Sequence, residues 1–199
     1  MAATRNKGKI KEFREALADL PVEIIGLDDF GSIAEPVEDG LTFAENALLK
    51  ARYYCQQTGV ICLADDSGLE VDFLQGVPGV WSARYAGESA TDDDNNAKLL
   101  LNMIQAGEGQ RQARFRSVLA IAGPDGSSLT ADGICEGILL KDLRGDGGFG
   151  YDPLFFVPEL GKTFAEMSIT EKGTISHRGR AFQQLKEKMR QLDSGIFPR

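Results

Sequence analysis

Two segments with strand-like alternation of apolar side chains, 112–122 and 128–140, constrain the fold of this chain most. They flank the turn Pro124-Asp125-Gly126, whose residue types favour tight turns. The hairpin lies among segments with helical spacing, so strands and helices are mixed along the chain. The pattern predicts an α/β protein with a mixed sheet. A length of 199 residues fits one domain, or two lobes that share a cleft.

Four segments have the apolar spacing of amphipathic helices. Thr42 and Glu45 form a capping box at the start of the second, and Gly59 closes it. Thr91 caps the third, and the last is expected to begin near Ser176. The buried faces expected are Ile10, Phe13, Leu17 and Leu20 in the first helix, which Pro21 ends; Ala44, Ala47, Leu48, Ala51 and Cys55 in the second; Ala97, Leu100, Leu101 and Ile104 in the third; and Phe182, Leu185, Met189 and Leu192 in the last.

Short strands are expected between these helices. Residues 22–25 read as a strand, and the acidic segment 28–40 reads as a loop. Residues 60–64 read as a buried strand that ends at Asp65, and the alternation of Leu69, Val71 and Phe73 predicts another strand. On this reading the acids between them lie in a turn at the end of a strand.

Charge and composition exclude several classes of protein. A hydrophobic fraction of 42% is that of an ordinary globular protein, and a formal charge of −8 disfavours long nucleic acids as partners. No stretch reaches the roughly 18 apolar residues of a membrane helix, and no signal peptide is visible, so neither membrane insertion nor export is indicated. Cys55, Cys62 and Cys135 lack metal-site spacing and, with Cys62 expected in the core, indicate a reducing compartment such as the cytoplasm.

The segment Thr4-Arg5-Asn6-Lys7-Gly8-Lys9 directly precedes the first helix. Backbone N–H groups at a helix start bind phosphate, and the two lysines add charge. The alternative is a solvated helix start with scattered lysines. A Walker A loop is excluded because the Gly-Lys-Ser/Thr ending is absent.

Carboxylates supply candidate metal ligands. Mg²⁺ takes one or two carboxylates together with substrate phosphates, and Asp65 and Asp66 follow a buried strand without a basic neighbour. Glu38 precedes the second helix, where Asn46 and Lys50 share one face. The alternatives are a surface Asp-Ser-Gly turn and a solvated loop acid. Glu35 is a weaker rival of Glu38.

Three further segments combine glycine, aromatic and basic residues. Residues 147–153 contain Phe149 and Tyr151, which can stack on a base, or else plug a glycine hairpin. His177, the only histidine, and Arg178 lie at a helix start; the guanidinium can bind phosphate or a purine carbonyl. Arg84 lies in the segment 82–86. Because no zinc pattern, Ser-His-Asp arrangement or Rossmann fingerprint appears, the residues favour water attack on phosphorus assisted by a hard metal.

Taken in order, these segments are more specific than any one of them. The chain resembles the inosine/xanthosine triphosphate pyrophosphatase family, house-cleaning enzymes that remove deaminated purine nucleotides, from Thr4 to about Leu192. The motifs that carry the resemblance are Thr4-x-Asn6-x-x-Lys9, Glu38-Asp39-Gly40-x-Thr42-Phe43-x-Glu45-Asn46-Ala47, Ala64-Asp65-Asp66-Ser67-Gly68, Ser82-Ala83-Arg84-Tyr85, Gly148-Phe149-Gly150-Tyr151-Asp152-Pro153 and Ser176-His177-Arg178-Gly179.

The resemblance implies a two-lobed α/β fold of residues 1–199 with a long central mixed sheet flanked by helices, a cleft between the lobes, and a homodimer. It implies hydrolysis of ITP, dITP and XTP to the monophosphate and pyrophosphate. It further implies Mg²⁺ on Glu38 and Asp66, with Asp66 as proton acceptor supported by Asp65. The residues implied for the triphosphate are Thr4, Arg5, Asn6, Lys7, Gly8, Lys9 and Lys50, and those implied around the nucleoside are Ser67, Phe149, Gly150, Tyr151, Asp152, Lys172, His177 and Arg178.

Two departures from the family pattern are visible. Family members usually carry a few more apolar residues before the Thr-x-Asn motif, so we expect either a shortened first strand or a start upstream. Trp81 stands where tyrosine is frequent. The rival functions are a pyrophosphatase for other modified nucleotides, a nucleotide sensor without turnover, and an acidic interaction protein whose motifs are surface turns.

Overall fold

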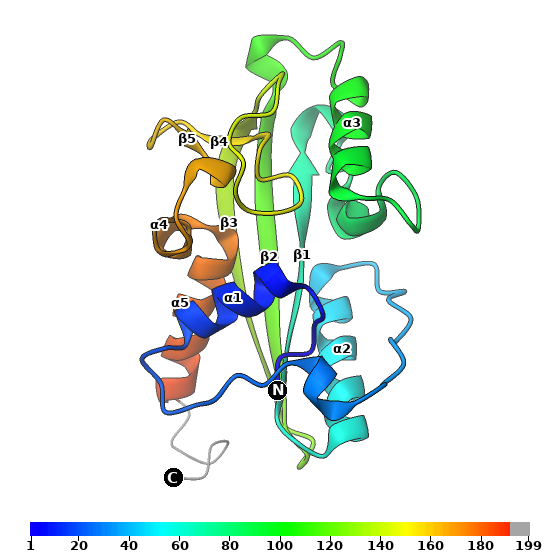
Figure 1. Cartoon of the computed structure of the whole chain (residues 1–199), viewed down its shortest axis with the longest axis vertical. Helices are drawn as coiled ribbons and strands as arrows, with labels where there is room; N and C mark the ends of the chain where they lie inside the picture. Colours follow the sequence, from blue (N-terminus) through cyan, green and yellow to red (C-terminus); the bar gives the residue numbers. More distant parts are fainter. Residues whose placement is uncertain (192–199) are drawn as a thin grey trace. The chain divides into compact units, whose positions relative to one another are not determined.

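The computed structural model describes residues 1–191, in which five strands form one sheet in the order β1-β2-β3-β4-β5 (Figure 1). The helices are α1 (Lys7–Ala16), α2 (Phe43–Thr58), α3 (Asp92–Asn102), α4 (Ile169–Ile175) and α5 (His177–Gln191). The strands are β1 (Cys62–Val71), β2 (Gln112–Ala122), β3 (Ser128–Leu139), β4 (Phe155–Val157) and β5 (Lys162–Thr163).

Helices and strands are interspersed along the chain, as predicted for an α/β protein, but the five strands form an antiparallel sheet and not the expected mixed one. Strands β3 and β4 are antiparallel with Ile138 opposite Phe156, and β4 and β5 are antiparallel with Phe156 opposite Thr163. A parallel bridge joins Ala2 to Leu63 of β1. The expected hairpin of β2 and β3 is confirmed, and its turn is closed by the Gly123 N–H, which donates to the Ser127 carbonyl at 3.0 Å.

Strand β1 corrects the prediction of two short strands around an acidic turn. It runs without interruption from Cys62 to Val71, so Asp65 and Asp66 lie in its middle. Aspartate and glycine are poor strand formers, which is why the sequence pattern breaks at this point. Ion pairs to the two carboxylates offset that local preference, as described below.

The predicted strand at residues 22–25 is wrong. The backbone there joins the N-terminal segment through Ile25, whose carbonyl accepts from the Ala2 N–H at 2.8 Å, and one such bond does not make a ladder. Val22 and Ile25 are 41% and 36% exposed. The expected first strand is correspondingly reduced to the single bridge of Ala2.

The helix boundaries agree with the predicted caps better than the helix faces do. Thr42 caps α2, Gly59 ends it in a left-handed conformation, and Thr91 caps α3. The predicted buried face of α3 is wrong, since Leu101 and Ile104 are 66% and 71% exposed. The residues that α3 buries are Asn95, Asn96 and Leu99. Of the face predicted for the last helix, Phe182 and Leu185 are buried in α5, whereas Leu192 lies outside the described residues.

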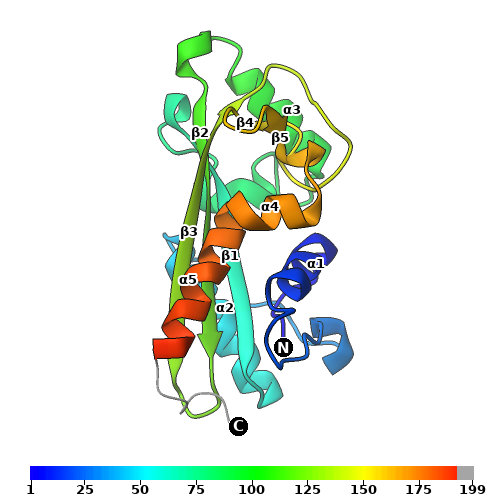
Figure 2. The same ribbon diagram turned by 90° about the vertical axis from the view of Figure 1, so that its left-hand side faces the viewer.

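The chain divides into two compact units, each with its own apolar core. Among the described residues, unit 1 comprises 1–66, 117–133 and 177–191, and unit 2 comprises 67–116 and 134–176. In unit 1, α1 and α5 meet through Phe13 and Phe182, whose rings are 5.3 Å apart, and they cover Leu119 of β2 and Ala131 of β3 (Figure 2). In unit 2 the core gathers around Phe155 of β4. The cleft that the resemblance implies stays a prediction.

Within residues 1–191, none of the helices has both the length and the apolar character needed to span a membrane.

Candidate active site

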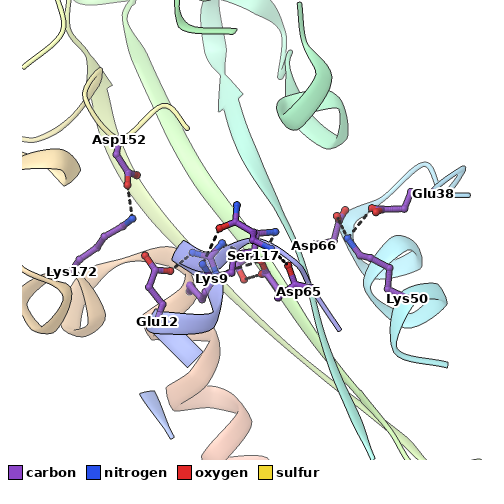
Figure 3. Close-up of polar contacts among 12 residues, drawn as sticks. Lys9, Glu12, Glu38, Lys50, Asp65, Asp66, Ser117, Asp152 and Lys172 are labelled. Atoms are coloured by element: carbon purple, nitrogen blue, oxygen red, sulfur yellow. Dashed lines mark hydrogen bonds and ion pairs between the residues drawn. The ribbon is translucent and has the colours of Figure 1, made fainter. Parts of the chain in front are cut away.

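Lys50 of α2 joins two carboxylates of unit 1. Its Nζ lies 2.7 Å from Glu38 Oε2 and 2.7 Å from Asp66 Oδ1 (Figure 3). Lys50 and Asp66 are each 8% exposed. An ammonium group held between the buried Asp66 and the partly buried Glu38 marks a position where the protein has arranged hard oxygen ligands around a positive charge.

The loop that carries Glu38 is anchored to α2 by Asn46. The Asn46 Oδ1 accepts from the Gly40 N–H at 2.8 Å, and the Asn46 Nδ2 donates to the Gly40 carbonyl at 3.4 Å. A Cβ on Gly40 would lie 2.5 Å from Asn46 Oδ1 and 2.9 Å from Glu45 Cβ, so a larger residue here would displace the Asn46 amide from this contact. As predicted, Asn46 and Lys50 share one face of the helix, and that face is buried.

Asp65 lies on the opposite face of β1 from Asp66, because successive side chains of a strand alternate. Its Oδ1 accepts from the Ser117 Oγ at 2.6 Å, and its Oδ2 lies 2.8 Å from Lys9 Nζ and 3.0 Å from Arg178 Nη2. Asp65 is therefore a buried anchor that ties α1, β2 and α5 to β1.

The start of α5 is placed by a close approach to β3. Arg178 is 2% exposed and also pairs with Glu12 of α1. A Cβ on Gly133 of β3 would overlap the backbone of His177 and Ala181, so only glycine lets α5 lie this near the strand. His177, the first residue of α5, is buried with Arg178.

The segment 4–9, which is predicted to bind phosphate, leads into helix α1 as expected. Asn6 caps α1 by accepting from the Lys9 N–H at 3.1 Å, and the Thr4 Oγ1 accepts from the Asn6 N–H. Lys7 is exposed, whereas Arg5 pairs with Glu35 at 2.6 Å. Glu35, the rival of Glu38, is thus placed against Arg5 and not against Lys50.

The two neighbouring aspartates have opposite pKa shifts. Burial raises the pKa of Asp66 above its usual range, against the opposing effect of Lys50. Burial would raise the pKa of Asp65 as well, but the charges of Arg178 and Lys9 outweigh it and hold that pKa well below its usual range. Asp65 is a fixed anion, and Asp66 is the carboxylate whose environment favours proton uptake.

The residues around Lys50 fit a divalent metal that is completed by substrate. The buried Oδ2 of Asp66 has no hydrogen-bond partner among residues 1–191. Within the same described range, no cluster of three or more His, Cys, Asp or Glu side chains is placed to hold a metal. Two carboxylates with one unused oxygen match Mg²⁺, which takes few protein ligands and fills its shell with phosphate oxygens and water.

A second group of predicted residues comes together within unit 2. Lys172 of α4 lies 2.7 Å from Asp152 Oδ2 (Figure 3). Its Nζ also lies 4.7 Å from the centre of the Phe149 ring. The Tyr151 hydroxyl donates to the Ser82 carbonyl at 2.8 Å. Phe149 is partly buried and its neighbours are fixed, which suits a stacking surface for a base. Ser67 follows Asp66 in β1.

Sequence reasoning missed Glu12, Ser117 and Gly133. The first two are ordinary polar residues whose partners lie 166 and 52 positions away along the chain, a separation that no local pattern encodes. Gly133 lies within the strand-like run 128–140, and a glycine inside a strand pattern is a known sign of close backbone approach.

Comparisons with known proteins agree with the motifs. A family model described as the Ham1 family matches residues 1–188. The chain is 51% identical over 190 residues to a dITP/XTP pyrophosphatase of Desulforamulus reducens, covering 96% of this chain and 94% of the relative. It is 53% identical over 185 residues to the protein of that name from Thermus thermophilus, covering 93% and 88%. The solved structure of a HAM1 protein from Coxiella burnetii superposes with a TM-score of 0.85 at 41% identity, covering 96% and 97%.

Proposed function

Because this chain belongs to the Ham1 family, we propose that it is a nucleoside-triphosphate pyrophosphatase that hydrolyses dITP, ITP and XTP. The products are the nucleoside monophosphate and pyrophosphate. Removal of these nucleotides clears deaminated purines from the nucleotide pool.

The observation that carries the chemistry is the unused Oδ2 of Asp66. It lies on a carboxylate whose other oxygen is held by Lys50, so the side chain is fixed while one oxygen stays available to accept a proton. Asp66 takes the proton from the water that attacks the α-phosphorus. Asp65 acts at a distance from the reacting atoms, by holding Lys9 and Arg178 in place.

Glu38 and Asp66 are the residues that would hold Mg²⁺, which when bound neutralises charge on the triphosphate oxygens. Lys50 holds the same two carboxylates and contributes a further positive charge beside the phosphates. The start of α1 offers backbone N–H groups and lysine side chains to the phosphates, and Arg5 offers its guanidinium. The residues concerned are Thr4, Arg5, Asn6, Lys7, Gly8 and Lys9. Stabilisation of developing charge by fixed groups is usually the largest catalytic contribution.

The nucleoside is assigned to Ser67, Phe149–Asp152, Lys172, His177 and Arg178. Inosine and xanthosine carry a carbonyl at C6, where adenine carries an amine. A donor such as Arg178 or a backbone N–H favours the carbonyl, and adenine would leave that donor unpaired. Arg178 is held by Asp65 and Glu12, which fixes the direction of its guanidinium.

A homodimer and a cytoplasmic location complete the proposal. The homodimer follows the family resemblance, and sedimentation of the purified chain tests it. The cytoplasmic location follows from three cysteines that are free thiols, all of them buried.

Hydrolysis of ITP in ¹⁸O-labelled water tests the proposed reaction. Attack at the α-phosphorus places the label in inosine monophosphate and leaves pyrophosphate unlabelled. Label in pyrophosphate, or release of inorganic phosphate, would refute the proposed step. Parallel assays with XTP and with modified pyrimidine triphosphates distinguish the proposal from a pyrophosphatase for other modified nucleotides. Binding of ITP without any product would indicate a sensor.

A further inference from the structure

Three consecutive aspartates begin α3, and they differ in what they contact. Asp94 completes the capping box with Thr91. Asp93 has no hydrogen bond or ion pair with any residue in the range 1–191. The Asp92 Oδ2 accepts from the Gly150 N–H at 2.7 Å, across 58 residues of chain. The helix dipole favours all three acids equally, so it does not account for the contact that Asp92 alone makes.

Asn96 lies one helical turn after Asp92 and binds the same residue. Its Nδ2 donates to the Gly150 carbonyl at 2.9 Å. Asn96 is 3% exposed, and its Oδ1 is buried without a partner within the described part of the chain. Burying an oxygen without a hydrogen bond costs free energy. The hydrogen bond from the Asn96 Nδ2 to Gly150 offsets that cost and explains an asparagine at this position.

Asp92 and Asn96 together satisfy both backbone groups of Gly150, which has a left-handed φ of +60°. The arrangement repeats the one seen in unit 1, where Asn46 binds both backbone groups of Gly40 and so places the loop of Glu38. In each case side chains of a helix form hydrogen bonds with the backbone of a glycine that lies close in sequence to a residue of the proposed site.

The segment around Gly150 is held from its other side as well. The Phe149 N–H donates to Asp152 Oδ2 at 2.9 Å, and the same oxygen forms an ion pair with the Lys172 ammonium. The Tyr151 side chain is tied to Ser82. Gly150 is thus the point at which α3 fixes a segment whose remaining anchors lie elsewhere in unit 2.

We propose that Asp92 and Asn96 are positioning residues for nucleoside binding, acting through the Gly150 backbone to place Phe149. The inference rests on the proposed function, which assigns residues 149–152 to the nucleoside. It predicts that the two side chains affect binding of the nucleoside and leave binding of the phosphates unchanged.

The test compares two products that share phosphate chemistry and differ in the nucleoside. Binding of inosine monophosphate and of pyrophosphate is measured by calorimetry, with Mg²⁺ present, for the wild type, Asp92→Ala, Asn96→Ala and Asp93→Ala. Asp92→Ala and Asn96→Ala are expected to weaken inosine monophosphate about five- to tenfold, the equivalent of one hydrogen bond, and to leave pyrophosphate unchanged. Asp93→Ala removes the same charge from the same turn and is expected to bind both as the wild type does. Asp92→Asn keeps an acceptor and is expected to retain most of the affinity.

Two outcomes would overturn the inference. Unchanged binding of inosine monophosphate in Asp92→Ala and Asn96→Ala would show that the hydrogen bonds to Gly150 have no part in nucleoside binding. An equal loss of affinity for inosine monophosphate and for pyrophosphate would show a merely structural role. Because Asp92 is exposed, its variant keeps the test decisive even if Asn96→Ala does not fold. Turnover is scored separately: a wild type that binds inosine monophosphate but does not cleave ITP refutes the proposed function and not the positioning role. A wild type that binds no inosine monophosphate refutes the positioning role.

Discussion

Asp65 and Asp66 are neighbours in β1, and their side chains lie on opposite faces of the strand. Asp65 is satisfied by Lys9, Ser117 and Arg178, whereas Asp66 binds Lys50 and keeps one buried oxygen without a partner in residues 1–191. The two carboxylates therefore do not act as a pair on one substrate atom. Asp65 organises the elements of unit 1, and Asp66 is the proton acceptor that we propose.

Replacing Asp66 by asparagine is expected to lower kcat on the order of a hundredfold or more, because the variant keeps the shape and loses both the charge and the base. The unfolding free energy should fall less than in Asp65→Asn, because Lys50 keeps Glu38 as a partner and burial disfavours the charge that is removed. Steady-state assays with ITP and urea unfolding measure the two quantities. Near-normal turnover by a folded variant would show that Asp66 is not the proton acceptor.

Replacing Asp65 by asparagine is expected to destabilise the protein by about 3 kcal/mol, because the buried Arg178 and the partly buried Lys9 would lose the carboxylate that they share. Chemical denaturation of this variant and of Asp66→Asn provides a matched pair, since the same substitution is made at adjacent positions. Equal stability of the two variants would contradict the division of roles between them.

Gly133→Ala is expected to destabilise the protein by about 3 kcal/mol, because the added Cβ would overlap backbone at the start of α5, which cannot move aside as a flexible side chain can. Gly173→Ala in α4 is the control. Within residues 1–191, no atom beyond its chain neighbours and the backbone of its own helix lies within 4 Å of its added Cβ, and alanine favours a helix by up to about 1 kcal/mol. Thermal unfolding of both variants should give shifts of opposite sign; a neutral Gly133→Ala would show that α5 does not need this close approach.

Glu171 provides a test of pH dependence. Hydrogen bonds from the Lys162 ammonium and from Ser168 lower the pKa of Glu171 from 4.5 to about 2. A carboxyl group whose pKa is lowered by folding stabilises the folded protein at pH values above the pKa that it has in the unfolded chain. That contribution is lost as the pH falls from about 4.5 toward 2. The Tm difference between the wild type and Glu171→Gln should be small, because the group is exposed, and should vanish across that window. A difference that persists unchanged at pH 2 would contradict the assignment.

Local signals sufficed for the helix caps and the long hairpin. Thr42, Glu45 and Gly59 bound α2 through contacts within a few residues of each other, which a single sequence encodes directly. The alternation in β2 and β3 is likewise local. Local signals do not predict the full length of β1, because Asp65 and Asp66 are poor strand formers in isolation and their partners come from α1, α2 and α5.

The candidate site was predictable as a set of motifs and not as an arrangement. The ion pairs of Lys50 with Glu38 and Asp66 bring together three predicted residues, yet no spacing rule states that one lysine joins both carboxylates. The burial of α3 differs from its sequence pattern for another reason. The apolar spacing predicts a buried stripe of apolar side chains, and the helix instead buries Asn95, Asn96 and Leu99.

Pyrophosphate release from ITP, measured against ATP and GTP with Mg²⁺ and with a chelator, tests the central claim most directly. The account predicts rapid release from ITP that the chelator abolishes, weak release from ATP and GTP, and near loss of ITP cleavage in Asp66→Asn. Cleavage of ATP as fast as ITP, or ITP cleavage that survives both the chelator and the Asp66 substitution, would contradict it.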